Sequence, residues 1–125
     1  MLGARILIVE DDAQNLELAT DLLEVAGHTV LQARSAEEGL RLARAERPDL
    51  VLMDVRLPGM DGHAAVGVLK GDPLTRAIPA VALTAQAMKA DEAKARDAGF
   101  DGYITKPIDA RSFAQSIARF LDLTG

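Results

Sequence analysis

The chain contains no cysteine and no tryptophan, and its aromatic residues are one tyrosine and three phenylalanines. The absence of cysteine excludes disulfide bonds and thiolate metal sites. No apolar run approaches the roughly 18 residues of a membrane-spanning helix. Residues 1–5 lead directly into a predicted strand and leave no room for a signal peptide. We therefore expect no membrane association and a cytoplasmic location.

Positive charge is also in short supply. Lysine and arginine together number 14 against 19 aspartates and glutamates, which gives a net charge of −5. The sequence has no basic stripe, so we expect no sequence-independent binding of nucleic acid. A chain of 125 residues suits one compact core, and we predict a single domain over residues 1–125.

Short apolar runs alternate with longer segments of helical period. The predicted strands are Arg5–Val9, Thr29–Ala33, Leu50–Met53, Ala80–Leu83 and Gly102–Ile104. The first, third and fourth are continuous apolar runs, which is typical of parallel strands covered on both faces. With right-handed crossovers, the pattern predicts an α/β fold, a (βα)5 doubly wound sheet of five parallel strands.

Several residues mark the ends of the predicted helices. Ser35 and Glu38 form a capping box. Gly27 and Gly99 stand where left-handed C-terminal caps are expected. Three aspartates are expected to cap helix N-termini: Asp12, Asp61 and Asp109.

Polar residues follow four of the predicted strands: Glu10, Asp11 and Asp12 after the first, Asp54 after the third, Thr84 after the fourth and Lys106 after the fifth. In an open parallel sheet, ligands bind beyond the carboxyl ends of the strands. Taken singly, each residue has an ordinary explanation, such as a helix cap or a solvated side chain. Together, the carboxylates would crowd one edge, which disfavours their ionisation unless a cation is present. Since Mg2+ prefers hard oxygen ligands, the sequence predicts a magnesium site.

The same residues suggest phosphoryl transfer to a carboxylate. Asp54 would be the nucleophile, because it is the isolated acid on the central strand. Asp11 would bind the metal, with Glu10 beside it through a water molecule. Lys106 would supply a fixed cation, and Thr84 would donate a hydrogen bond to a phosphoryl oxygen.

Five motifs carry a resemblance to a known family: Ile-Leu-Ile-Val-Glu-Asp-Asp (6–12), Pro-Asp-Leu-Val-Leu-Met-Asp (48–54), Leu-Pro-Gly-Met-Asp-Gly (57–62), Leu-Thr-Ala (83–85) and Tyr-Ile-Thr-Lys-Pro (103–107). In this order and at these spacings, the chain resembles the receiver domain of bacterial two-component response regulators, of the stand-alone, single-domain type. The resemblance covers essentially the full length. It implies a flavodoxin-like sheet with strand order 2-1-3-4-5.

The resemblance also implies a set of roles at the sheet edge. Asp54 matches the residue that accepts a phosphoryl group from the phosphohistidine of a histidine kinase or histidine-phosphotransfer protein. Asp11 matches the direct Mg2+ ligand, and Glu10 matches its acidic neighbour. The backbone carbonyl of Arg56 matches the third protein ligand, and Lys106 matches the family lysine.

Two further residues match the family's conformational switch. Thr84 matches the hydroxyl that moves toward the phosphoryl group, and Tyr103 matches the aromatic that then turns inward. The resemblance also implies a cis Lys106–Pro107 bond.

The chain departs from the family pattern in its acidic pair, Glu-Asp in place of Asp-Asp, which preserves the charge. The side chain of Arg56 has three open interpretations: a solvated rim residue, a partner of Glu10, or a cover over the acyl phosphate.

The sequence ends soon after the fifth predicted helix, so we expect its output to be contact with a downstream protein target. The first helix carries an apolar arc wider than a core stripe requires. Asn15, Leu18 and Leu22 are therefore candidates for docking a histidine-phosphotransfer domain, although ordinary burial would also explain the arc. The fourth helix, fifth strand and fifth helix around Tyr103 form the second candidate surface.

Other classes share parts of this pattern. A flavodoxin-like electron carrier needs a hydroxyl- and glycine-rich phosphate loop after the first strand, but here that loop is acidic. An aspartate-nucleophile phosphatase normally has Asp-x-Asp after the first strand. A pseudo-receiver would lack the acceptor, the metal acid or the lysine, and all three are present. A receiver module excised from a hybrid histidine kinase or a larger response regulator remains the main alternative.

Overall fold

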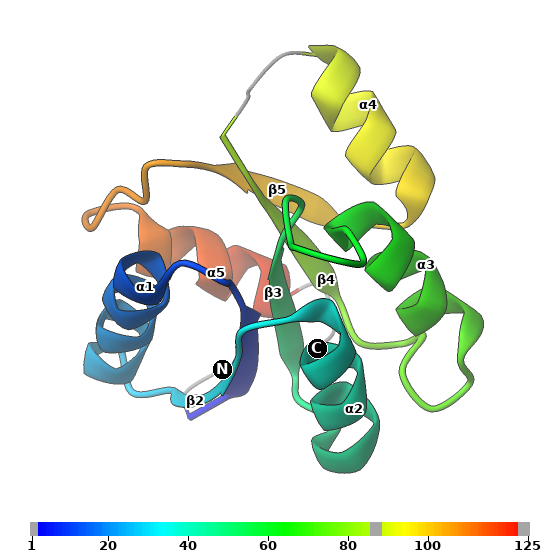
Figure 1. The fold of residues 1–125 in the computed structure, drawn as a ribbon. Coiled ribbons are helices and arrows are strands. Elements are labelled where there is room, and N and C mark those ends of the chain that lie inside the picture. The colour runs from blue at the N-terminus through cyan, green and yellow to red at the C-terminus, as the bar shows by residue number, and fades with distance from the viewer. Residues whose placement is uncertain (1–2, 86–88, 123–125) are drawn as a thin grey trace.

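The computed structural model describes residues 3–85 and 89–122, which form a five-stranded parallel sheet flanked by helices (Figure 1). The strands are β1 (Arg5–Val9), β2 (Thr29–Ala33), β3 (Leu50–Asp54), β4 (Ala80–Thr84) and β5 (Gly102–Thr105). Their order is β2-β1-β3-β4-β5, and every neighbouring pair is parallel. The predicted fold class and strand order are confirmed.

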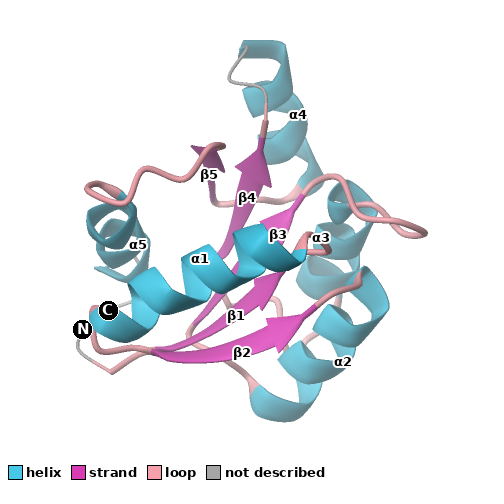
Figure 2. Cartoon of the chain, turned by 60° about the vertical axis from the view of Figure 1, so that its left-hand side comes forward, coloured by secondary structure: helices cyan, strands magenta, loops and turns pink. Residues whose placement is uncertain are grey.

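Helices cover both faces of the sheet. They are α1 (Ala13–Val25), α2 (Ala36–Glu46), α3 (Gly62–Gly71), α4 (Lys89–Ala98) and α5 (Phe113–Asp122). Figures 1 and 2 show α1 and α5 on one face and α2, α3 and α4 on the other. Within the described residues, no helix is long and apolar enough to span a bilayer.

The strands at the centre of the sheet contribute to two hydrophobic cores, one on each face. On β1, Leu7 and Val9 face the core under α2 and α3, while Ile6 and Ile8 face the core under α1 and α5. All five residues of β3 are buried. Burial on both faces explains why these strands are continuous apolar runs rather than alternating ones.

Three strands are one residue longer than the apolar pattern predicts. They end at Asp54, Thr84 and Thr105, because Asp54 is in register with Leu83 and Thr84 with Thr105. Backbone pairing satisfies N–H and C=O groups whatever the side chain, so polar residues can extend a strand. As a result, Asp54 and Thr84 are held in the ordered end of the sheet.

Most of the predicted helix caps are confirmed. The side chains of Asp12, Ser35 and Asp61 accept backbone N–H groups at the starts of α1, α2 and α3. Asp109 was expected to cap the fifth helix, and this prediction is wrong. Its carboxylate accepts a backbone N–H within a preceding turn, and α5 begins only at Phe113.

Gly62 allows α3 to begin directly against the end of β3. A Cβ atom at this position would lie 2.4 Å from the carbonyl oxygen of Asp54 and 2.7 Å from the Cα of Val55. Any side chain here would therefore displace the strand end that carries Asp54.

Candidate functional site

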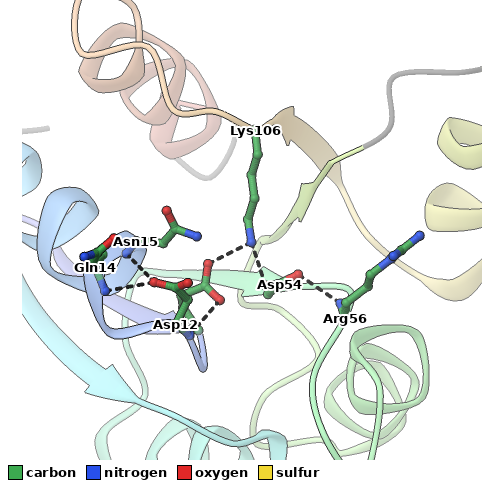
Figure 3. Close-up of polar contacts among 7 residues, drawn as sticks. Asp12, Gln14, Asn15, Asp54, Arg56 and Lys106 are labelled. Atoms are coloured by element: carbon green, nitrogen blue, oxygen red, sulfur yellow. Dashed lines mark hydrogen bonds and ion pairs between the residues drawn. The ribbon is translucent and has the colours of Figure 1, made fainter.

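Lys106 lies between two buried carboxylates at the carboxyl end of the sheet. Its Nζ is 2.8 Å from Oε1 of Glu10 and 2.7 Å from Oδ2 of Asp54. Glu10 directly follows β1, Asp54 ends β3 and Lys106 directly follows β5. Glu10 is 1% exposed and Asp54 5% exposed. Figure 3 shows the Lys106 side chain reaching down to Asp54.

Asp54 belongs to β3 itself, and backbone hydrogen bonds to neighbouring strand ends hold Glu10 and Lys106 in place. The N–H of Glu10 donates to the carbonyl of Ala33 at 3.0 Å, and that of Lys106 donates to the carbonyl of Thr84 at 2.7 Å. The Lys106–Pro107 bond is cis, in agreement with the resemblance. The site is therefore an extension of the sheet rather than a free loop.

Lys106 is shared by two buried acids, Glu10 and Asp54, and this sharing affects the pKa values in the cluster. Burial, followed by the neighbouring Asp54, raises the pKa of Glu10 from 4.5 to about 7, although Lys106 opposes the shift. Burial lowers the pKa of Lys106, but its hydrogen bonds to Asp54 and Glu10 outweigh burial and raise the pKa overall. The cluster is thus short of positive charge.

The carboxylates of Glu10, Asp11 and Asp54 could hold a metal ion. One oxygen from each lies within 4.8 Å of the others. Oε1 of Glu10 is buried and forms an ion pair with Nζ of Lys106, the same cation that Asp54 contacts. Asp11 is exposed, which leaves the cluster open to solvent. Three hard oxygens open to solvent on one side fit Mg2+, which binds few carboxylates and keeps several waters.

A cleft beside this cluster contains Thr84 and reaches α4. Its volume is about 540 Å³, and its walls include Asp11, Arg56, Thr84 and Lys94. The sequence correctly predicted that Thr84, Asp11 and Asp54 gather at one edge.

Arg56 contributes its backbone rather than its side chain. Its N–H donates to Oδ1 of Asp54 at 2.9 Å. The side chain is exposed, and Figure 3 shows it pointing away from Asp54. Glu10 is paired with Lys106 instead, so the proposed pairing of Arg56 with Glu10 is wrong in this state. The structure agrees with a solvated rim residue.

Tyr103 is held by a partner that the sequence did not indicate. Its hydroxyl donates a hydrogen bond to Glu92 of α4. That hydrogen bond, followed by burial, raises the pKa of Tyr103. In the sequence, Glu92 is an ordinary acidic residue in the first turn of a polar helix, so nothing local marks it as the partner of Tyr103.

The predicted docking residues of α1 lie on the open side of that helix. Leu18 is 42% exposed, whereas Asn15 and Leu22 are half-buried. Leu22 also packs against the core, so ordinary burial explains part of the wide apolar arc.

A family model of the response regulator receiver domain matches residues 6–118. The chain belongs to this receiver family. Among curated proteins, the receiver is 43% identical over 116 residues to the polar-differentiation response regulator DivK of Brucella anthropi, covering 93% of this chain and 94% of that protein.

Solved structures resemble this receiver over nearly its whole length. A putative response regulator from Chloroflexus aurantiacus gives a TM-score of 0.91 at 32% identity, covering 96% of this chain and 98% of that one. The receiver domain of a sensor histidine kinase from Pseudomonas aeruginosa gives 0.88 at 31% identity, with the same shares covered. That second structure has a magnesium ion coordinated in its active-site cleft.

This receiver is therefore a component of two-component signalling, in a family whose members act as signalling switches. Receiver domains accept phosphoryl groups from histidine kinases.

Proposed function

We propose that this receiver accepts a phosphoryl group on Asp54 from the phosphohistidine of a histidine kinase or histidine-phosphotransfer protein, with Mg2+ as cofactor. The observation that carries the proposal is the position of Asp54. It is a buried carboxylate at the end of the central strand and forms an ion pair with Lys106. Two further acids lie close to it, beside an open cleft.

In the proposed reaction, a carboxylate oxygen of Asp54 attacks the phosphorus atom. A P–O bond forms while the P–N bond to the imidazole breaks, and the electron pair of that bond returns to the imidazole nitrogen. Lys106, already 2.7 Å from Asp54, would neutralise charge on a phosphoryl oxygen. Thr84 would donate a hydrogen bond to another phosphoryl oxygen.

Glu10, Asp11, Asp54 and the backbone carbonyl of Arg56 would hold the metal ion. When bound, Mg2+ supplies positive charge to the phosphoryl oxygens and relieves the repulsion among the carboxylates. The sharing of one lysine by the two buried carboxylates of Glu10 and Asp54 supports this assignment.

Phosphorylation would then change the surface formed by α4, β5 and α5. Thr84 would move toward the phosphoryl group, and Tyr103 would leave Glu92 and turn inward. This surface would bind the downstream protein target. Asn15, Leu18 and Leu22 of α1 would dock the phosphohistidine donor.

Intact mass spectrometry tests the acceptor. After incubation with Mg2+ and acetyl phosphate, we expect wild type to gain one phosphoryl group and Asp54→Asn to gain none. Asp61→Asn is the matched control, since Asp61 lines the same cleft but caps α3. Asparagine also caps helices well, so this variant should still gain the group. A phosphoryl group on Asp54→Asn would overturn the assignment.

Tyrosine fluorescence tests the switch, because Tyr103 is the sole tyrosine of a chain without tryptophan. Phosphorylation of wild type should change its emission as the hydroxyl leaves Glu92. Thr84→Ala should gain the phosphoryl group with little change in emission. An equal change in both proteins would contradict the role of Thr84.

One alternative concerns the protein in which this receiver occurs and leaves the proposed reaction unchanged. The similar receiver from Pseudomonas aeruginosa belongs to a sensor histidine kinase. If this chain is a module of such a kinase or of a larger response regulator, Asp54 keeps the same role. A cytoplasmic location stays a prediction.

A further inference from the structure

A second apolar surface lies away from the acceptor site. Within the described residues, four large apolar side chains are exposed: Leu18, Val25, Val68 and Leu74. The first two lie on α1. Val68 of α3 is 49% exposed, and Leu74, in the segment after α3, is 42% exposed.

Val68 and Leu74 form one side of a groove of about 600 Å³. The other side is α2, and Figures 1 and 2 both show α2 and α3 side by side. The remaining wall residues are Leu40, Arg41, Arg44 and Ala45. We call these six residues the α2–α3 groove.

Four of the six residues that line the α2–α3 groove are apolar, and the other two are arginines. Arg44 makes an ion pair with Asp72 at 2.9 Å, yet its side chain is still 62% exposed. Arg41 is exposed and takes part in no ion pair with any described residue. Arg41 therefore offers an unpaired positive charge at the rim of the groove, and Arg44 offers exposed N–H donors although Asp72 neutralises its charge.

We propose that the α2–α3 groove binds an acidic amphipathic helix of a partner protein. Helix binding in a groove places apolar residues, spaced three and four apart, into an apolar channel. Leu40, Ala45, Val68 and Leu74 supply that channel. Carboxylates beside the apolar stripe of the partner would pair with Arg41 and with the exposed donors of Arg44.

Charge favours a protein helix over an anionic membrane. The whole chain is negative, so an anionic lipid surface would repel most of it. A single helix in the groove lies closest to the unpaired Arg41 and to the exposed donors of Arg44, and more distant charges are screened.

This binding goes beyond the proposed switch. No residue of the α2–α3 groove lines the cleft beside Asp54. Nor does the groove include Tyr103 or any part of the surface formed by α4, β5 and α5. The partner helix therefore binds with or without phosphorylation and leaves the output surface free.

A pair of synthetic peptides tests the proposal. Both are capped alanine-based helices with leucines at positions i, i+3, i+4 and i+7. One carries glutamates beside the leucines and the other carries lysines. In NMR titrations, the glutamate peptide should shift the amides of groove residues and bind roughly fivefold more tightly than the lysine peptide.

Charge reversal sharpens the test. Arg41→Glu should abolish or invert the preference for the glutamate peptide, because the rim then carries the opposite charge. Arg119→Glu, the same change at an exposed position of α5, should keep it. Val68→Asn, which removes an apolar contact without adding charge, should weaken binding of both peptides. The NMR spectrum of each variant also shows that it is folded.

Three results would overturn the proposal: equal binding of both peptides, shifts confined to Leu18 and Val25 of α1, or a preference unchanged in Arg41→Glu. Analytical ultracentrifugation without peptide tests whether a second copy of the chain occupies the groove. If the chain self-associates and Val68→Asn prevents it, the groove binds a second copy and the proposal of a partner helix is wrong.

Discussion

The two edges of the sheet each hold a lysine against carboxylates, but they balance charge differently. At the carboxyl edge, Lys106 is shared by the buried acids Glu10 and Asp54. At the amino edge, Lys70 pairs with the single acid Asp101 at 2.9 Å.

The amino edge satisfies its groups with backbone partners. The Nζ of Lys70 also donates to the carbonyl of Ile78 at 2.8 Å, and Oδ2 of Asp101 also accepts the N–H of Ala80 at 2.8 Å. These bonds join the end of α3 to the beginning of β4 and to the turn before β5. The Lys70–Asp101 pair thus has one cation for one acid, and its backbone partners complete the hydrogen bonding of both groups.

The carboxyl edge keeps an excess of negative charge that faces a cleft. The pairing of Lys70 with Asp101 shows that a lysine in contact with a carboxylate does not by itself indicate a site. A binding site is indicated where buried carboxylates have fewer hydrogen-bond donors and cations than they need and lie within reach of solvent cations. The following changes test this difference.

Lys106→Met should have the largest effect. It leaves two buried carboxylates without their cation, and such losses cost about 4 kcal/mol of unfolding free energy. Urea unfolding in EDTA measures the loss, and added Mg2+ should recover part of it. Lys94→Met, which alters an exposed lysine of the cleft, is the control. A loss no greater than in that control would contradict the account of the cluster.

The pH dependence of Glu10 should come next. Its pKa is raised from 4.5 to about 7, so between these values the folded chain holds a proton that the unfolded chain releases. In EDTA, the stability of wild type relative to Glu10→Gln should therefore fall as pH rises through this window, by up to about 3 kcal/mol. Urea unfolding of both proteins at several pH values measures the difference. Parallel curves would contradict the shift.

Asp101→Ala should cost about 2 kcal/mol, because it removes the acceptor of a charged donor and of a backbone N–H. Asp97→Ala changes an exposed acid of α4 and should cost little. The loss should not depend on Mg2+, whereas changes at the carboxyl edge should. A Mg2+-dependent loss would break the contrast between the two edges.

Mg2+ itself should have the smallest effect. At ten times its dissociation constant, it should stabilise wild type by about 1.4 kcal/mol. Asp11→Ala should lose this gain but remain at least as stable as metal-free wild type, since it removes a crowded negative charge. Thermal unfolding with and without Mg2+ checks both expectations. Wild type without a rise in midpoint would mean that the cluster binds no metal.

The sequence was sufficient for the sheet and for the gathering of polar residues at its carboxyl edge. Continuous apolar runs reveal doubly covered strands, and the edge rule brings Glu10, Asp54 and Lys106 together. It could not show that Lys106 already pairs with both acids, because that depends on the conformation of the lysine side chain.

The sequence also did not reveal the ion pair between Lys70 and Asp101 at the amino edge. Lys70 and Asp101 are 31 positions apart, and each reads in isolation as a solvated charge. Likewise, the orientation of Arg56 and the bond between Tyr103 and Glu92 depend on loop and helix positions for which the local sequence gives no signal.

The wide separation of the site residues along the chain has a consequence for folding. Lys106 and Asp54 are 52 positions apart, and Glu10 comes from the first strand. The cluster forms only after β1, β3 and the end of β5 have docked, and such long-range parallel pairings form slowly. An incomplete or partly folded chain therefore lacks this arrangement of Asp54, Glu10 and Lys106. If Asp54 is the acceptor, as we propose, only fully folded chains take a phosphoryl group, and unfinished chains do not compete with them for the donor.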